Sequence, residues 1–144
     1  MGTFRSSATI PRAPEAVWAA LADPSLGLRV FSGCSRSELT TPPPLRRGSR
    51  LRIVRTVDGK TVEVEFDVVV FRPAKELEIS GEAQGFRAEY RYVLRPEGAG
   101  TRVDLECTVA GLGLAALMEG TVTEALRRAD ADHLERLRAA AESA

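Results

Sequence analysis

The chain has 144 residues, 44% of them hydrophobic, which fits one folded domain, residues 1–144, with a core of ordinary size. Its 20 basic and 20 acidic residues balance, so no excess of positive charge favours nucleic acid as a partner. The opening MGTFRSSATIPRAP lacks the features of a signal peptide, and no segment reaches the roughly 18 consecutive apolar residues of a membrane span. We therefore expect a cytoplasmic protein without an integral membrane segment.

The first part of the chain predicts one strand and two short helices. Residues 3–10 have the composition of a short strand, and Pro14 follows at a position where a helix starts without losing a hydrogen bond. Val17, Trp18 and Leu21 form one apolar stripe, which makes Trp18 a packing residue rather than a ligand platform. Asp23-Pro24 ends this helix, and residues 26–31 allow one or two further turns.

The middle of the chain has the alternation of antiparallel strands. An Asp58-Gly59 pair predicts a tight hairpin that joins strands at residues 50–56 and 61–71. Further strands are expected at residues 75–80, 85–95 and 101–109. In GFRAEYRYVLRP the dry face carries two tyrosines, Tyr90 and Tyr92, whose hydroxyls need partners if they are buried.

The last segment, residues 112–143, has helical spacing and would form a helix on the order of 45 Å long. That is longer than any of the strands, so the helix must cross the whole sheet. Gly120 weakens a helix by about 1 kcal/mol relative to alanine, and we expect a kink or a close contact there. The inner stripe of this predicted helix contains Met118, Val122, Ala125, Leu126, Ala129, His133, Leu137 and Ala140.

These elements predict an α+β fold of the helix-grip type, with a curved antiparallel sheet of about seven strands around a long C-terminal helix and two short helices after the first strand. The run ATIPRAPEAVWAALADP resembles the opening of the START-like helix-grip (SRPBCC) proteins of the polyketide cyclase/dehydrase and lipid-transport group. The resemblance continues through RRGSRLR, VVVFRPAKEL, GAGTRVDLE and HLERLRAAAE, and so covers essentially the whole chain.

The resemblance implies a cavity between the sheet and the long helix. The residues expected to line it and bind a ligand are Phe66, Val68, Tyr90, Tyr92, Leu105, Cys107, Met118 and Val122, with Arg55 as a further candidate. The alternative is a closed core, in which each tyrosine reaches solvent or a backbone carbonyl at the rim.

Two residues are candidates for polar chemistry. Arg55 interrupts an apolar alternation, so it either points inward, where it would orient a carbonyl or carboxylate, or is exposed because the strand twists near the Asp58-Gly59 turn; we favour exposure. His133, the only histidine, follows Asp130 by one helical turn and would be a general base if the carboxylate held it. We expect instead that it closes the far end of the helix–sheet interface, beyond the pocket.

Cofactor and metal sites are not expected. The Gly111-Leu112-Gly113 region fits a loose dinucleotide pattern, but no second parallel strand follows the helix. One histidine with two distant cysteines, Cys34 and Cys107, has no metal-ligand spacing, and the two thiols are expected to be small side chains of the core.

The sequence also departs from the cyclases of the family. Aromatase/cyclase members carry an arginine inside the cavity on the long central strand, where this chain has residues 68–71, Val-Val-Val-Phe, and an aromatic hydroxyl near the position of Cys34. A second branch, similar to an accessory protein of carbon monoxide dehydrogenase, shares features of FSGCSRSEL and TVAGLGLAAL.

We therefore expect a monomer or homodimer that binds a hydrophobic small molecule, lipid or polyketide-like, and does not depend on a single acid or base. One alternative is a polyketide cyclase/dehydratase in which Tyr90, Tyr92 or Arg55 polarises a carbonyl. The other is an accessory or interaction subunit, of the carbon monoxide dehydrogenase type, with an exposed apolar patch.

Overall fold

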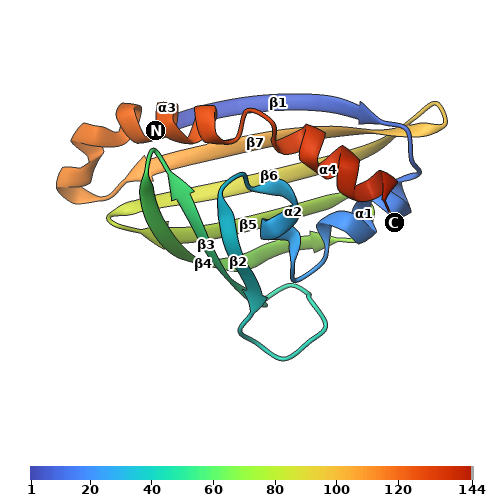
Figure 1. Ribbon diagram of the computed structural model, residues 1–144, viewed down its shortest axis with the longest axis horizontal. Helices are drawn as coiled ribbons and strands as arrows, with labels where there is room; N and C mark the ends of the chain where they lie inside the picture. Colours follow the sequence, from blue (N-terminus) through green and yellow to red (C-terminus); the bar gives the residue numbers. More distant parts are fainter. Residues whose placement is uncertain (144) are drawn as a thin grey trace.

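A computed structural model describes residues 1–143 and shows a curved, entirely antiparallel sheet of seven strands that wraps around helices (Figure 1). The order across the sheet is β1-β7-β6-β5-β4-β3-β2, so the first strand lies beside the last and all other neighbours are consecutive. The expected helix-grip architecture is confirmed. The strands are β1 (Gly2–Ile10), β2 (Cys34–Leu39), β3 (Arg50–Val57), β4 (Lys60–Arg72), β5 (Glu76–Ala83), β6 (Phe86–Glu97) and β7 (Gly100–Gly111).

The turn between β3 and β4 is the two-residue hairpin that the sequence predicts. Val57 pairs with Lys60, and Asp58 and Gly59 both have positive φ angles, 48° and 76°. These values are those of the mirror-image turns whose twist matches that of the flanking strands. Asp-Gly is a favoured pair for this turn because aspartate tolerates, and glycine readily adopts, a left-handed backbone.

A bulge interrupts β4 and bends the sheet. Val68 pairs with Ile79 and Val70 with Glu78, so Val69 has no partner of its own on β5 and is 40% exposed. A bulge of this kind increases the local twist of a strand. The strict alternation expected through Val70 therefore ends at Val68.

The two short helices cover one end of the sheet. They are α1 (Pro14–Leu21), with Pro14 in its first turn as expected, and α2 (Leu26–Val30). Leu21 of α1 and Leu26 of α2 are completely buried. Trp18 is half-buried and packs edge-on against Phe71, with 5.1 Å between ring centroids.

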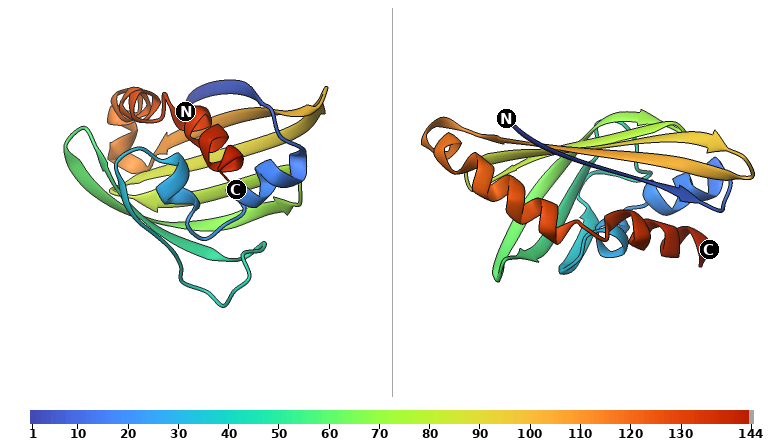
Figure 2. Two further views of the ribbon diagram at one scale, coloured as in Figure 1. Left: turned by 45° about the vertical axis from the view of Figure 1, so that its right-hand side comes forward. Right: turned by 90° about the horizontal axis from the view of Figure 1, so that it is seen from above.

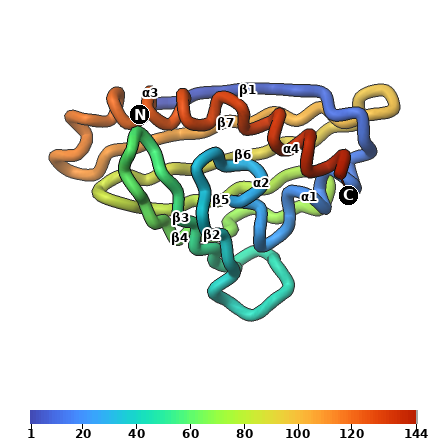
Figure 3. The backbone as a smooth tube through the Cα atoms, in the orientation of Figure 1, coloured from blue at the N-terminus to red at the C-terminus, as the bar shows by residue number. Residues whose placement is uncertain are grey.

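The C-terminal region lies on the concave side of the sheet and consists of three segments (Figure 2). They are the 3₁₀ helix η1 (Gly113–Met118), α3 (Glu119–Ala129) and α4 (His133–Glu142). The chain passes from the end of β7 through α3, which contacts β1, β7 and β3, to α4 beside α1 and α2 (Figure 3).

The break in this helical region lies at residues 130–132, not at Gly120, where we expected it. Gly120 is the second residue of α3, where the backbone N–H has no partner within the helix, so a glycine costs little. Asp130 still donates its N–H to the Leu126 carbonyl, but its φ and ψ of −101° and 16° leave the helix. The contacts of its side chain, described below, account for this position.

Candidate functional site

A buried ion pair joins β3 to the break between α3 and α4. Arg55 Nη2 donates a hydrogen bond of 2.8 Å to Asp130 Oδ1, and the two side chains are 5% and 0% exposed. The same nitrogen lies 3.4 Å from the Ser32 carbonyl oxygen. Our expectation that Arg55 is exposed is therefore wrong, because Asp130, which is 75 residues away in the chain, compensates its charge in the interior.

Two tyrosines of β6 extend this pair into a network. The Tyr90 hydroxyl donates to Asp130 Oδ2 at 2.6 Å, and the Tyr92 hydroxyl lies 2.7 Å from His133 Nε2. Both rings face inward, as the alternation of β6 predicts, and both are completely buried. Each hydroxyl thus finds a partner on the C-terminal region rather than at the rim of the fold.

Phe31 packs against this network and separates it from water. Its ring centroid lies 5.0 Å from those of Tyr90 and His133, in edge-on geometry. The Arg55 guanidinium carbon lies 4.6 Å from the Phe31 centroid, a distance suited to a cation–π contact. We refer to Phe31, Arg55, Tyr90, Tyr92, Asp130 and His133 as the polar cluster.

The ionisation states in the cluster follow from burial and from the neighbouring charges. Burial alone would raise the pKa of Asp130, but His133 and Arg55 outweigh it and hold that pKa below its ordinary value. Burial would lower the pKa of Arg55, and Asp130 reverses this effect. Burial, together with the charge of Asp130, raises the pKa values of Tyr90 and Tyr92 far above the ordinary range, so both remain hydroxyls.

Two nitrogens of the cluster are buried without a hydrogen-bond partner. They are Arg55 Nε and His133 Nδ1. The latter lies 3.7 Å from Asp130 Oδ1, which is longer than a hydrogen bond. Buried polar groups usually have partners, so the cluster retains unused hydrogen-bonding capacity.

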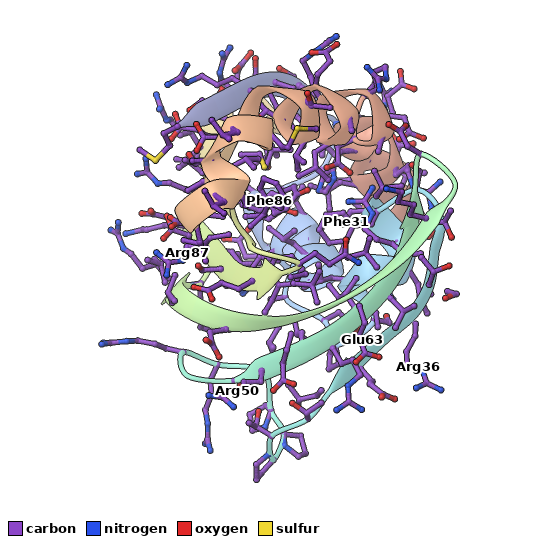
Figure 4. The ribbon with its side chains drawn as sticks, turned by 90° about the vertical axis from the view of Figure 1, so that its left-hand side faces the viewer. Phe31, Arg36, Arg50, Glu63, Phe86 and Arg87 are labelled. Carbon is purple, nitrogen blue, oxygen red and sulfur yellow. The ribbon has the colours of Figure 1, made fainter. Side chains whose placement is uncertain are left out.

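Beside the cluster, the core is bordered by apolar side chains that are only partly buried. Apolar side chains from β4, β6 and α3 pack against the core there but stay partly exposed; these are Val64, Phe86, Ala88, Val122 and Leu126, and we call them the half-open end. Seen from this end, Phe86 and Phe31 point inward beneath the helix, whereas Arg36, Arg50, Glu63 and Arg87 point away (Figure 4).

The residues expected to bind a ligand divide into three groups. Phe66, Val68, Leu105 and Cys107 are buried in the core with the two tyrosines. Val122 is half-buried at the half-open end. Met118 is 52% exposed, so our placement of it on the inner stripe is wrong, because η1 ends there and α3 begins only at Glu119.

His133 is also not where we expected it. It does not lie beyond the site but is completely buried between Phe31 and the two tyrosines. We did not identify Asp130 as a residue of the site in its own right. Its spacing was a usable signal, since it lies four residues after Leu126 and three before His133, which places it on the inner face of a helix.

The two cysteines differ in their surroundings. Cys107 is completely buried, and burial raises the pKa of its thiol. Cys34 is half-buried and packs against the edge of the core, and burial raises the pKa of its thiol as well. It lies at the start of the edge strand β2, opposite Arg55.

Two hollows of about 470 and 480 Å³ lie on the opposite, outer face of the sheet. Charged side chains line much of both, and several are paired, as Arg5 is with Glu106 and Arg50 with Asp67, at 2.8 and 3.0 Å. Such surfaces do not suit an apolar ligand. A cavity between sheet and helix remains a prediction.

Comparison with known proteins agrees with this architecture. The family model described as polyketide cyclase / dehydrase and lipid transport matches residues 1–142. The chain belongs to this family. Among curated proteins, none matches the sequence significantly.

Solved structures share the fold at low sequence identity. TTHA0849 from Thermus thermophilus superposes with a TM-score of 0.81 at 22% identity, over 99% of this chain and 98% of that one. Ara h 8.0201 gives 0.76 at 16% identity, over 99% of both chains. DynU16, a protein in the dynemicin biosynthetic locus, gives 0.64 at 17% identity, over 98% of this chain and 47% of that one.

Neither a metal centre nor a membrane span is found in the described part of the chain. Within residues 1–143, no group of three or more His, Cys, Asp or Glu side chains is placed to hold a metal ion. Over the same residues, no helix combines the length and the hydropathy that crossing a bilayer requires.

Proposed function

We propose that the protein binds a hydrophobic small molecule, lipid or polyketide-like, between α3 and the sheet at the half-open end. The observation that carries this proposal is the contrast between the two C-terminal helices. No residue of α3 is fully buried, although Val122 and Leu126 pack against the core, whereas α4 buries four residues. A ligand that covered these apolar side chains would gain about 25 cal/mol for each Å² removed from water.

The contacts that hold α3 over this end include a weak one. Arg128 of α3 and Asp58 of the β3–β4 turn form an ion pair of 3.1 Å, and both side chains are more than half exposed. Exposed pairs of this kind contribute at most about 1 kcal/mol. Separating α3 from the hairpin to admit a ligand would therefore cost little at this contact.

A blocking substitution tests the proposal. Ala88→Trp would place an indole on the inner face of β6, two residues from Phe86, and we expect it to weaken binding of the neutral apolar dye N-phenyl-1-naphthylamine by at least about tenfold, which corresponds to about 1.4 kcal/mol. Val69→Trp, the same type of change on the outer face, is the control and should bind as the wild type does. Equal binding by wild type and both variants would refute a site at the half-open end.

A second function, that of a polyketide cyclase or dehydratase, is favoured by the polar cluster. The Tyr90 hydroxyl and the Arg55 guanidinium both donate to Asp130, so a carbonyl brought next to them would meet the unpartnered Nε–H of Arg55, and would meet the Tyr90 O–H only after it turned away from Asp130. Turnover of a poly-β-ketone substrate that Tyr90→Phe reduces more than it reduces binding would support this function.

A further inference from the structure

Arg55 of the polar cluster has a hydrogen-bond donor that the protein does not use. Arg55 bonds to Asp130 and to Ser32 through Nη2, and its buried Nε has no partner. A guanidinium donates hydrogen bonds but never accepts them, so this nitrogen can be satisfied only by a hydrogen-bond acceptor. An unused donor in a buried position favours a bound group that supplies the missing oxygen.

The position of Arg55 on its strand places this donor beside the half-open end. Arg55 pairs with Val62 of β4, and both Val62 and Val57, the inward neighbour toward the turn, are only half-buried. Ile53, the inward-facing residue of β3 on the side of Arg55 away from the turn, is completely buried. Arg55 therefore stands at the boundary between the closed core and the partly exposed apolar side chains.

The charge of Arg55 is already balanced by Asp130. The two form the one arginine–carboxylate pair that is buried among residues 1–143. A ligand carboxylate would bring a second negative charge next to Asp130, and two carboxylates in one buried site repel each other. A neutral acceptor would satisfy Arg55 Nε without disturbing this balance.

We infer that the ligand is an apolar molecule that carries a neutral acceptor, such as a ketone, ester or lactone carbonyl, and that this oxygen contacts Arg55. The inference rests on the proposed binding site at the half-open end. It adds that Asp130 excludes carboxylates from the site.

Three probes of nearly equal size separate these properties. They are 2-acetylnaphthalene, which has a carbonyl, 2-isopropenylnaphthalene, which replaces its oxygen by carbon, and 2-naphthoate, which is anionic. Binding to the full chain is measured by equilibrium dialysis at neutral pH. We expect the ketone to bind about tenfold more tightly than the hydrocarbon, and the carboxylate to bind more weakly than both.

Changing the charge of the cluster should change this order. Asp130→Asn keeps the shape of the side chain but leaves Arg55 unbalanced, so the carboxylate should gain at least about tenfold and overtake the ketone. Arg55→Met/Asp130→Asn removes both charges and the unused donor, so the ketone should lose its advantage over the hydrocarbon. Asp67→Asn, which changes an exposed aspartate on the outer face of the sheet, is the control and should keep the wild-type order.

The outcomes distinguish this inference from the proposed function. Equal binding of ketone and hydrocarbon to wild type, or tightest binding of the carboxylate, would overturn the inference and leave a hydrophobic site in place. An unchanged order in both cluster variants, each shown to be folded by circular dichroism, would also overturn it. Failure of all three probes to bind would refute the proposed site itself.

Discussion

At the scale of single residues, Arg55 and Asp130 determine how the interior is arranged. Moving either charge from water into a protein interior costs several kcal/mol, so each tolerates burial only because the other is 2.8 Å away. Tyr90 adds a hydrogen bond to the second carboxylate oxygen. The contacts of Asp130 draw its side chain inward at the residue where α3 ends, which is why the helix breaks there.

Two arginine–aspartate pairs in the same fold allow a matched test of this account. Arg55→Met leaves the Asp130 carboxylate buried without its ion partner, and we expect a loss of about 3–5 kcal/mol in the free energy of unfolding. Arg128→Met breaks the exposed pair with Asp58 and should cost no more than about 1 kcal/mol. Urea denaturation measures both values, and similar losses would show that burial of the pair is not what matters.

The lowered pKa of Asp130 predicts a loss of stability in acid. Because this pKa is lower in the folded protein, the unfolded chain takes up the proton first as the pH falls. The contribution of Asp130 to the unfolding free energy is complete above the ordinary aspartate pKa of about 3.9. It is lost as the pH falls through the lowered pKa of the folded protein.

Asp130→Asn should therefore show a shallower decrease in unfolding free energy than the wild type below about pH 4. Other carboxylates, such as Glu76 and Glu119, also have lowered pKa values and contribute to both curves, so the difference between the curves is the quantity to examine. Parallel curves would mean that Asp130 has the same pKa in the folded and unfolded states.

At the scale of elements, α3 and α4 differ in how firmly they are held. α4 packs on α1 and α2 and buries His133, Leu134, Leu137 and Ala141. α3 lies along β1 and β7 with no fully buried residue. Elements with few buried contacts open locally at lower free energy than the rest of a fold.

Hydrogen exchange followed by mass spectrometry should reveal this difference. We expect the amides of α3 to exchange before those of α4, and a bound apolar ligand to slow the exchange of α3 selectively. Simultaneous exchange of both helices, with or without ligand, would show that they open as one unit.

The first helix belongs to the opposite end of the molecule from the half-open end. Trp18→Ala removes the edge-on contact with Phe71 and should cost about 3 kcal/mol of stability, at the lower end for such a truncation because the indole is half-buried. Dye binding should be unchanged under conditions in which the variant is folded. A loss of binding with unchanged stability would make Trp18 part of a ligand site.

At the scale of the whole molecule, local patterns predicted the architecture well because they record which face of each element is buried. The alternation around Tyr90 and the Asp58-Gly59 pair predicted an inward face and a hairpin from neighbouring residues alone. The bulge at Val69 carried no such signal, because valine suits either face of a strand.

The candidate site was predicted less completely, because its members are paired across long stretches of the chain. The strand pattern left two orientations open for Arg55, inward or exposed. Only the ion pair with Asp130, which is distant in the sequence, decides between them. The prediction that no single acid or base is indispensable rested partly on placing His133 outside the site. It stays a prediction, and the burial of His133 beside Tyr92 makes His133→Ala its most informative test.

The two thiols are buried to different extents, so the rates at which they are alkylated report on different motions of the protein. Burial raises the pKa of both thiols, but an alkylating reagent should still reach the half-buried Cys34 in the native state, whereas the completely buried Cys107 becomes available only when the sheet separates from the helices. At reagent concentrations high enough for alkylation to be faster than reclosing, the time course of the second modification would then give the rate at which the fold opens around Cys107.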